Sequence, residues 1–376
     1  MRIAYFVSNR TVFPGTHDQI TASSSVVHNI ISVLKKRHDI TVFAPKGSHM
    51  DGVRIANLGS DPFHLDSDIV QDEWVTKYTI GKKLWFIGEI LKQAHMFDLI
   101  HIHTEPIYLG MAFVNLIKTS VLFTSHNAVH DYEVDLYMSH LRNNINFSAL
   151  SYAQIGKLSN STIPVIPNGI EYTDIPFYSG KDAHGYLFLG RLVEDKGIDT
   201  LIHLIESDLQ RKYSIVGKGS AQWEKIIVMA AEKNSQITFH SILPRLSTEW
   251  SHTIGKSKAL LMPIRYEDTC PLVPLEAMAH GTPVIAFARG ALPEQIEDGK
   301  TGFLINPSNT DMRGNYFMKE TGISGLKSAI SHIEQMPLPK YMELRRQCRV
   351  RIEKLFSVER MAASYETLYN TILANR

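Results

Sequence analysis

Residues 185–217 read GYLFLGRLVEDKGIDTLIHLIESDLQRKYSIVG, and this stretch decides the fold. An apolar run, Tyr186–Leu189, is followed by a polar loop, a helical stretch and a second apolar run, Tyr213–Val216. Short buried strands that alternate with helices are typical of βαβ units, which build parallel sheets. The stretch therefore predicts one repeat of a doubly wound α/β domain.

The same alternation extends along the chain in both directions. Before this stretch, the predicted strands are Ile3–Val7, Ile40–Phe43, Leu99–His103, Val121–Thr124 and Phe147–Leu150, and helical patterns include Ser24–Arg37 and Ile107–Lys118. After it, the predicted strands are Gln236–His240, Ala259–Met262, Pro283–Phe287 and Phe303–Ile305. We predict an α/β protein with two doubly wound, Rossmann-like domains, as expected for 376 residues, because one hydrophobic core rarely grows that large.

A change of composition marks the domain boundary. After the apolar run Ile163–Ile166, the residues 167–184 are polar and rich in turn formers. From Ser324 the chain reads as two helices interrupted at Pro337 and Pro339, the second of them Val358–Leu373 with Ser357 as N-cap. The predicted organisation is a domain at 1–167, a linker at 168–184, a second domain at 185–356 and a final helix at 357–376, with Asp61–Glu73 as a solvated loop.

Composition excludes several classes of protein. Lys plus Arg is 39 against 38 for Asp plus Glu, whereas nucleic-acid binders need clustered cationic residues. The two cysteines allow no disulfide framework, and no zinc-ligand spacing is present. The apolar opening ends at Ser8, and no run of 18 apolar residues occurs. We expect a soluble, cytoplasmic protein whose cysteines stay reduced.

The loop after Tyr186–Leu189 has the composition of an anion site. Gly190 and Arg191 follow the strand, and Lys196 and Gly197 precede the next helix. Ligands of open α/β sheets bind beyond the carboxyl ends of the strands, and helix N-termini favour anions. Arg191 and Lys196 therefore suit a diphosphate, although two surface cations beside a solvated helix end are an equally good interpretation.

A second candidate segment follows the strand Ala259–Met262. Pro271 suits the first helical turn, which leaves the amides of Leu272 and Val273 free for a ligand. Asp268 and Glu276 lie eight positions apart and would flank that ligand. On spacing alone, a capping aspartate with a locally paired helix glutamate is favoured over a binding pair.

Three histidines follow or end strands of the first domain. His126 comes directly after Val121–Thr124, and a lone histidine in such a place is more often structural than catalytic. His101 and His103 alternate on one strand without a further metal ligand nearby, so we interpret both as structural.

Together these motifs resemble retaining nucleotide-sugar glycosyltransferases of the GT-B fold, family 4 (glycosyl transferases group 1). The resemblance rests on the three motifs Gly190-Arg191-Leu192-x-x-x-Lys196-Gly197, Asp268-x7-Glu276-Ala-Met-Ala-x-Gly281-Thr-Pro-Val and Ile166-Pro167-Asn168-Gly169-Ile170. It spans nearly the whole chain, since Asp98-x-x-His101-x-His103 and Pro293-Glu294 fall in the family's order.

The resemblance implies an acceptor-binding first domain and a donor-binding second domain that face each other across a cleft, with the last helix crossing back. Arg191 and Lys196 would hold the donor diphosphate without a metal ion, and the Leu272 and Val273 amides would complete the cradle. The resemblance also implies that Glu276 binds the nucleotide ribose. Asp268 would hold hydroxyls of the donor sugar, and His126 would line the reaction centre.

The implied reaction is transfer of a sugar with retention of anomeric configuration, by front-face departure and attack. Double displacement through Asp268 is the minority alternative. The nucleotide-diphosphate sugar is a substrate, so no cofactor is implied. The acceptor is a glycan, a natural product or a lipid-linked sugar, with no nucleic acid as partner. The helical stretch Lys82–Phe97 reads as a core helix rather than an interfacial one, because cationic residues are not in excess on its polar face.

Two positions depart from the family pattern. Asp268 replaces the usual glutamate, and Glu267 is a candidate substitute for it. The usual glycine pair before the first long helix is Thr21-Ala22, so Gly15 would supply the flexible turn, with hydroxyls from residues 23–25. These departures leave two alternatives open: a nucleotide-sugar epimerase of the same fold, and a catalytically silent nucleotide-binding member. A dinucleotide oxidoreductase is excluded because no G-x-G-x-x-G follows the opening strand.

Overall fold

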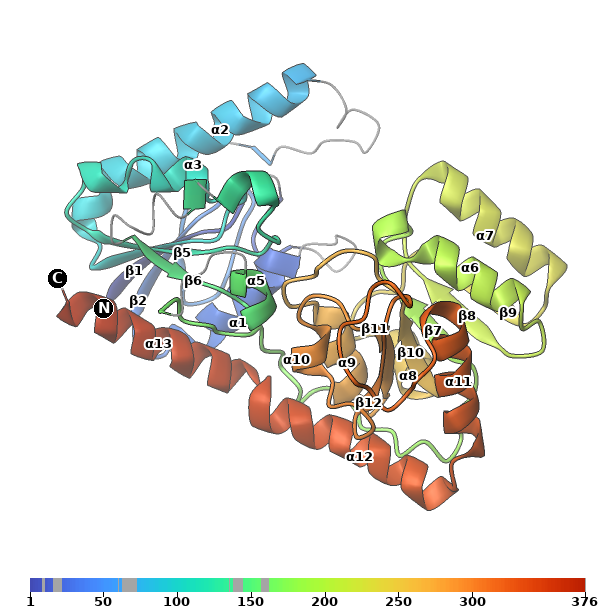
Figure 1. Ribbon diagram of the computed structural model, residues 1–376. Coiled ribbons are helices and arrows are strands. Elements are labelled where there is room, and N and C mark those ends of the chain that lie inside the picture. Colours follow the sequence, from blue (N-terminus) through green and yellow to red (C-terminus); the bar gives the residue numbers. More distant parts are fainter. Residues whose placement is uncertain are drawn as a thin grey trace. The chain divides into compact units, whose positions relative to one another are not determined.

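The computed structural model describes residues 1–8, 11–15, 22–59, 61–62, 73–134, 136–137, 145–156 and 162–375 (Figure 1). The chain forms two compact units, Met1–Gly169 with Val358–Arg376, and Ile170–Ser357. Residues 170–184, expected in a linker, belong to the second unit. The last helix, α13 (Val358–Ala374), belongs to the first.

The first unit contains a six-stranded parallel sheet. Its order is β3-β2-β1-β4-β5-β6. The strands are β1 (Arg2–Phe6), β2 (Asp39–Phe43), β3 (Arg54–Ala56), β4 (Leu99–Ile102), β5 (Ser120–Thr124) and β6 (Asn146–Ser148). The five predicted strands are confirmed with shifts of up to two residues at their ends, and β3 is an addition that its three residues did not reveal.

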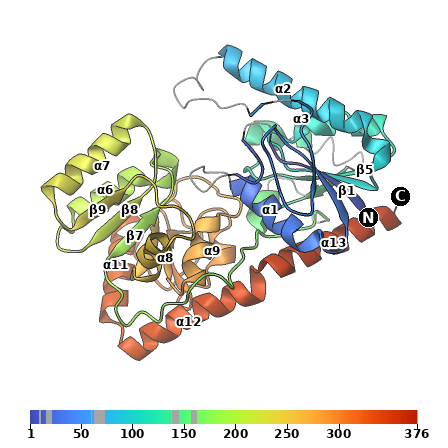
Figure 2. The same cartoon turned by 180° about the vertical axis from the view of Figure 1, so that it is seen from behind.

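Helices cover both faces of this sheet. The helices of the unit, besides α13, are α1 (Ala22–Leu34), α2 (Glu73–Lys92), α3 (Tyr108–Met111), α5 (Tyr152–Ile155) and the short 3-10 turns Ala94–Met96, Val114–Leu116 and Asp131–Glu133. Phe86, Ile87 and Ile90 of α2 pack on one face, and α1 and α13 lie side by side on the other (Figures 1 and 2). The predicted core helix at 82–97 is therefore the second half of α2, continued by a 3-10 turn.

One predicted helix of the first unit is wrong. The sequence predicted a helix over Ile107–Lys118, but the structure has α3 and then a separate 3-10 turn at Val114–Leu116. Gly110 and the β-branched Val114 and Ile117 have low helix propensity, which disfavours one continuous helix. The predicted loop Asp61–Glu73 lies mostly outside the described residues, and Glu73 is the first residue of α2.

The second unit repeats the arrangement. Its sheet has the order β12-β11-β10-β7-β8-β9, which is the first sheet's order when each unit's strands are counted from its first. The strands are β7 (Tyr186–Leu189), β8 (Tyr213–Val216), β9 (Ile237–His240), β10 (Ala259–Met262), β11 (Val284–Phe287) and β12 (Gly302–Ile305). All six predicted strands of this half are confirmed.

Seven helices of the described second unit surround this sheet. They are α6 (Ile198–Glu206), α7 (Ala221–Lys233), α8 (Thr248–Gly255), α9 (Leu272–Ala279), α10 (Leu292–Gln295), α11 (Gly322–Gln335) and α12 (Leu338–Leu355), with a 3-10 turn at Glu194–Lys196. Helices α6, α7 and α11 pack on one face, and α8, α9 and α12 on the other. Three helices, not two, follow residue 320, because Pro337 is the N-cap of α12 and Pro339 lies in its first turn, so the prolines begin a helix.

Helix α12 fixes the position of α9. The Arg349 guanidinium donates to the Ala279 carbonyl at the carboxyl end of α9 at 2.8 Å, where the helix dipole favours a cation. Arg345 is fully buried and donates to the carbonyls of Tyr178, Ser257 and Gly255. These bonds leave the opposite, N-terminal end of α9 directed to the sheet's carboxyl edge.

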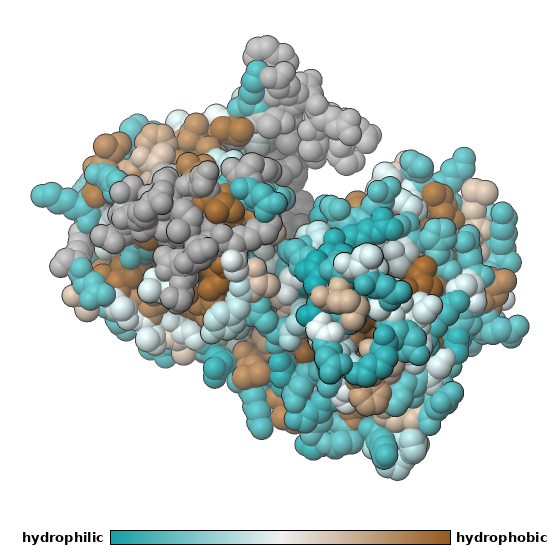
Figure 3. All heavy atoms as spheres, viewed as in Figure 1, coloured by the Kyte–Doolittle hydropathy of each residue, from teal (hydrophilic) through white to brown (hydrophobic). Residues whose placement is uncertain are grey.

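The surface differs between the units. On the face shown in Figure 3, hydrophilic side chains predominate over the second unit, whereas hydrophobic groups are frequent on the described part of the first. Tyr78 and Trp85 of α2 are about half exposed. No helix among the described residues is long and apolar enough to span a membrane. Cys270 and Cys348 are both buried thiols.

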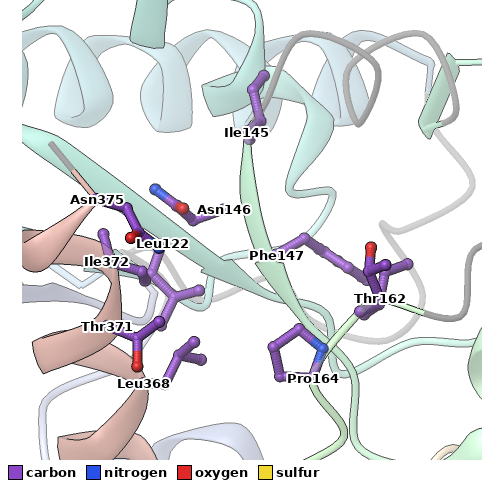
Figure 4. Close-up of a pocket in the computed structure, with 11 residues that line it drawn as sticks. Leu122, Ile145, Asn146, Phe147, Thr162, Pro164, Leu368, Thr371, Ile372 and Asn375 are labelled. Atoms are coloured by element: carbon purple, nitrogen blue, oxygen red, sulfur yellow. The ribbon is translucent and has the colours of Figure 1, made fainter.

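A pocket of about 300 Å³ lies in the first unit (Figure 4). It is lined from β5 by Leu122, from β6 by Asn146 and Phe147, and from α13 by Leu368 and Ile372. The rest of the lining comes from Ile145, the segment 162–164 and the end of the chain, and it includes neither His126 nor Gly15. The pocket is therefore separate from the candidate site described next.

Candidate functional site

Both sheets have the strand order in which ligands bind beside the two central strands, where the winding reverses. In the second unit these strands are β7 and β10, which pair in parallel. The loop after β7 carries Arg191 and Lys196, and the loop after β10 carries Asp268. The topology therefore brings the two predicted segments of this half to one place.

Glycines make the loop after β7 follow the neighbouring loop closely. The amide of Leu192 donates to the Lys218 carbonyl at 2.8 Å, which extends the pairing of β7 and β8. A Cβ on Gly217 would lie 1.8 Å from the Gly190 carbonyl oxygen, so only glycine fits there. Arg191 lies in this extended segment with its side chain exposed.

Gly197 turns the chain from this loop into α6. It has a left-handed backbone with φ of 77°, and a Cβ there would lie 1.9 Å from the Pro263 carbonyl oxygen. This close approach holds the turn with Lys196 against the end of β10. The sequence motif Lys196-Gly197 is thus one structural unit, in which the glycine places the lysine.

Lys196 meets Asp268 across the two central strands. The Lys196 Nζ lies 2.9 Å from Asp268 Oδ2, and the exposed fractions of the two side chains are 19% and 12%. The Tyr266 hydroxyl hydrogen-bonds both groups, and Nζ lies 4.7 Å from the centre of the Tyr266 ring. Burial and the Asp268 charge raise the pKa of Tyr266, against the lowering effect of the nearby Arg191. The arrangement is a half-buried cation–carboxylate pair bridged by a phenol.

Glu267 does not join this cluster. Its carboxylate accepts from the Gly290 amide at 2.5 Å and pairs with Arg289 at 3.1 Å and Arg313 at 3.0 Å. The Ala291 amide donates to the Asp268 carbonyl at 2.8 Å, so the two loops are also tied through the backbone. The structure assigns Glu267 to holding the loop, and its predicted role as a substitute for Asp268 is not supported.

The N-terminus of α9 presents two backbone amides. Pro271 is the N-cap rather than a residue of the first turn, and α9 begins at Leu272. Pro274 is the third helical residue, so two of the four amides that a helix start leaves unpaired are missing. Those remaining belong to Leu272 and Val273, the residues that the sequence indicated.

Glu276 lies farther along α9 and is buried, with 6% of its surface exposed. The Arg245 guanidinium, from the loop between β9 and α8, lies 2.7 Å from its Oε1. The Arg245 Nε is buried and has no hydrogen-bond partner in the described part of the chain. Asp268 lies before the helix starts and Glu276 within it, so the two carboxylates do not share a helix face.

In the first unit, His126 follows β5 at the carboxyl edge of the sheet. Its Nε2 lies 2.9 Å from His103 Nδ1, and its amide donates to Glu105 Oε1 at 2.5 Å. The same carboxylate accepts from the Ser125 hydroxyl and the Asn127 amide. Burial lowers the pKa of His126 to about 4 and raises the pKa of Glu105. The loop that carries His126 is therefore fixed by one buried carboxyl group.

His101 and His103 are fully buried, as their structural interpretation requires. His101 bonds the Tyr369 hydroxyl of α13 at 2.7 Å and the Thr124 hydroxyl at 2.8 Å. Tyr369 also bonds Tyr5 at 2.8 Å. Burial lowers the pKa of both histidines well below the usual value, so they are neutral rings inside a polar network.

Gly15 lies in the loop after β1. Its amide donates to the Ser24 hydroxyl of α1 at 3.2 Å, and the Ser24 side chain is buried. One of the hydroxyls expected near the ligand is thus used to hold the loop onto the helix. Thr21, half of the Thr21-Ala22 departure, lies outside the described residues, and Ala22 begins α1.

Comparison with known proteins addresses the second unit directly. Residues 178–319 match the family described as "Glycosyl transferases group 1". The chain contains a glycosyl transferases group 1 domain. All the predicted donor residues of the second unit, from Arg191 to Glu276, lie within these matched residues of the group 1 domain.

Relatives of the group 1 domain include the glycogen synthase of Pseudomonas aeruginosa, which is 30% identical over 235 residues, or 61% of this chain and 40% of that protein. The chain spans less than half the length of the first curated relatives it matches.

Solved structures share the fold over the whole chain. Sucrose-phosphate synthase from Thermosynechococcus elongatus has a TM-score of 0.77 at 17% identity, with 100% of both chains covered. The Anabaena protein HepE in complex with UDP has a TM-score of 0.72 at 14% identity, covering 99% of this chain and 100% of that one. The fold is the GT-B fold of glycosyltransferases.

The sequence did not indicate three further residues, two beside the site in the group 1 domain and one beside His126 in the first unit. Tyr266, Arg245 and Glu105 each bond a predicted residue or its loop. Tyr266 stands two residues from Asp268 and Glu105 two residues from His103, so proximity to a motif was a usable signal for them. Arg245 lies in a different loop from Glu276, and only the fold brings the two together.

Proposed function

We propose that this protein transfers a sugar from a nucleotide-diphosphate donor to an acceptor, with retention of anomeric configuration and without a divalent metal. The observation that carries the proposal is the Lys196–Asp268 pair at 2.9 Å, placed at the winding reversal of the group 1 domain. A phosphate-binding cation and a sugar-binding carboxylate in contact suit a ligand in which diphosphate and sugar are joined.

The diphosphate would be held by charge and by backbone amides. Arg191 offers an exposed guanidinium able to bind phosphate oxygens in a bidentate manner, and Lys196 adds a point charge. The Leu272 and Val273 amides add two donors at the positive end of α9. These groups would stabilise the negative charge that develops on the departing nucleotide.

Asp268 and Lys196 would exchange partners when the donor binds. A diphosphate carries more negative charge than one carboxylate, so it competes with Asp268 for Lys196. The Asp268 carboxylate, still fixed by the Tyr266 hydroxyl and its backbone, then becomes available to accept from sugar hydroxyls. An aspartate side chain is shorter than a glutamate side chain, so its reach depends on the position of the loop backbone. Gly290 and Ala291 fix that position by close contact with the Asp268 backbone.

Retention is proposed by front-face departure and attack. A carboxylate that accepts a hydrogen bond from the Tyr266 hydroxyl and from sugar hydroxyls is a poor nucleophile, which disfavours a covalent intermediate on Asp268. The leaving diphosphate itself is then the base nearest to the incoming hydroxyl. The solved relatives named above suggest UDP-linked or similar donors, since HepE was crystallised with UDP and with UDP-glucose.

The first unit would bind the acceptor, a glycan, a natural product or a lipid-linked sugar. Its predicted contribution to the reaction is His126, a neutral ring at the end of β5. Glu276, paired with Arg245, would bind the ribose hydroxyls of the donor.

The test is release of nucleoside diphosphate from UDP-, GDP-, ADP- and TDP-sugars, without acceptor and with EDTA. Wild type is compared with Arg191→Ala, and with Lys225→Ala as a matched control, because Lys225 is an exposed basic residue that lies on α7 and in neither of the two loops. We expect slow release from one donor, lost in Arg191→Ala and retained in Lys225→Ala.

Two outcomes would depart from this expectation. An Arg191→Ala protein that releases nucleotide at the wild-type rate would refute the diphosphate assignment. No release from any donor, together with thermal stabilisation by a nucleotide, would indicate strict acceptor dependence or a silent binder. A glycan acceptor panel then separates these two cases, and an epimerised sugar recovered from the incubation would identify an epimerase.

A further inference from the structure

Two histidine rings of the first unit are hydrogen-bonded to each other. His103 follows β4 and His126 follows β5, and these strands pair in parallel. His103 Nδ1 lies 2.9 Å from His126 Nε2. Both rings have a lowered pKa because of burial, so both are neutral and each carries one proton.

The other nitrogen of His103 is decisive. His103 Nε2 is buried and has no hydrogen-bond partner in the described part of the chain. The ring is enclosed by Tyr5, stacked at 6.2 Å between ring centres, and by His101 at 3.9 Å. Only 1% of the His103 surface is exposed. Whatever His103 carries on Nε2 therefore stays unpaired.

The two possible tautomers of His103 differ in what they leave unpaired. With the proton on Nε2, a buried N–H group would have no acceptor. With the proton on Nδ1, that N–H points at His126 Nε2, and only a ring lone pair lacks a partner. Buried N–H groups without an acceptor are rarer in proteins than acceptors without a donor.

We infer that His103 is a positioning residue that donates its Nδ1 proton to His126 Nε2 and so forces His126 to carry its own proton on Nδ1. The orientation of His126 is fixed at the same time, because Glu105 accepts from the His126 amide and from both neighbouring residues. Tautomer and orientation are thus set by two different groups, one on each side of the residue.

The inference rests on the proposed function for its chemical meaning. At the ligand, His126 acts as a hydrogen-bond donor through Nδ1, suited to an oxygen of the donor sugar or of the leaving diphosphate. It does not act as a general base, because the nitrogen that holds its lone pair is occupied by His103. The sequence pattern His101-x-His103 therefore has two separate tasks: His101 joins β4 to α13, and His103 sets the proton of His126.

The first experiment reads the tautomer without any substrate. Protein labelled with 15N histidine is studied by long-range 1H–15N correlation NMR, with His126→Gln and His103→Asn used to assign the signals. We expect a protonated Nδ1 and an unprotonated Nε2 on His126, and the same pattern on His103. A protonated Nε2 on His126 would overturn the inference, whether or not the protein is active.

The second experiment uses two replacements of His103 that differ in one atom type. An asparagine places an amide N–H near the position of Nδ1, whereas leucine has a similar volume and no donor. We expect His103→Leu to reduce kcat for nucleotide release roughly tenfold with little change in KM, and His103→Asn to recover much of that loss. Equal activity of the two variants would overturn the positioning role.

Folding is checked separately, because His103 is buried. Hydrogen exchange of β1, β4 and β5 shows whether the Leu variant keeps its fold, and the NMR tautomer of His126 is read in both variants. A loss of activity in His103→Leu with an unchanged His126 tautomer would also overturn the inference. The expected tautomer in a wild type that releases no nucleotide, either alone or with the acceptor panel, would instead refute the proposed function and leave the inference standing.

Discussion

The carboxyl edges of the two sheets have the same strand order and opposite chemistry. In the second unit the residues that follow the central strands are charged and paired, Lys196 with Asp268 and, on α9, Glu276 with Arg245. In the first unit, the described residues after β4 and β5 include two neutral rings, His103 and His126, and His126 is held by His103 and Glu105. The comparison teaches that the fold selects where a ligand binds, while the residues after each strand select its charge.

The buried carboxyl groups show the same contrast. Glu276 is balanced by a guanidinium at 2.7 Å, whereas the Glu105 carboxylate accepts from the Ser125 hydroxyl and from backbone amides of the described chain, and burial raises the pKa of Glu105. Burying a carboxylate without a counter-charge favours its neutral form. Among the described residues, the carboxyl edge of the first sheet therefore carries a carboxyl group without a cationic partner, whereas both carboxylates at the second edge are paired with cations.

The largest effect should come from removing the charge of Asp268. If Asp268 binds the donor sugar as proposed, we expect Asp268→Asn to lower kcat for nucleotide release roughly 10²–10³-fold, because the carboxylate charge is lost while Tyr266 keeps its hydrogen bond. Glu267→Gln is the matched control and should change kcat by less than about threefold, as for a side chain outside the site. Steady-state kinetics with the best donor measures both. Similar losses of kcat in the two variants would mean that the reaction depends on the negative charge of the whole loop and not on the carboxylate that pairs with Lys196.

A smaller effect is expected from acid, and it should fall mainly on the first unit. His101, His103 and His126 have folded pKa values below the usual 6.5, so the unfolded chain binds more protons below that pH. Stability is then lost as pH falls below 6.5; for His126, with a folded pKa of about 4, the loss is about 1.4 kcal/mol per pH unit between these two values. Glu105 opposes this, because its raised pKa lets the folded state take up a proton.

The second unit has His280 as its histidine with a resolved shift, to a pKa of about 4. Hydrogen exchange at pH 7 and pH 5.5, corrected for intrinsic rates, should show β1, β4 and β5 losing roughly 2 kcal/mol more protection than β7, β10 and β11. Equal losses of protection in both sheets would mean that the buried neutral histidines do not make the first unit more sensitive to acid than the second.

The smallest effect should come from Arg245→Met. Breaking a fully buried ion pair costs several kcal/mol, but the Arg245 side chain is 31% exposed, so we expect about 1–2 kcal/mol of lost unfolding free energy. Arg313→Met removes a guanidinium from an exposed pair and should cost less than about 1 kcal/mol. Urea unfolding of the full chain measures both. A larger loss of unfolding free energy in Arg313→Met than in Arg245→Met would mean that the Glu276–Arg245 pair does not stabilise the protein more than an exposed pair does.

Periodicity was sufficient for most of the fold. Every strand of the second unit was predictable, since each is a short apolar run between turn residues, and only the three-residue β3 was missed in the first. The break between α11 and α12 was predicted at Pro337 and Pro339, but the number of helices was wrong, because proline both ends and begins helices.

The site was predictable where a residue's position after a strand is enough. Lys196 and Asp268 could be placed at one sheet edge because β7 and β10 are neighbours. The contacts of Tyr266, Arg245 and Glu105 depend on side-chain directions and loop approach, such as the missing Cβ of Gly290 against Asp268. The local sequence does not determine such distances, so the partner of each predicted residue could be identified only in the structure.

The hydrogen bonds of Tyr369 with Tyr5 and His101 connect the last helix to the first strands across the whole sequence. During synthesis, the second unit is complete once residue 357 has left the ribosome, while the first must wait for α13 with its polar network open. The continuous unit thus has the chance to fold first, and the discontinuous one closes last. In a fragment ending at residue 169, Tyr5 and His101 would lose their hydrogen bonds to Tyr369. The first unit should therefore be expressed separately only with residues 358–375 joined to it.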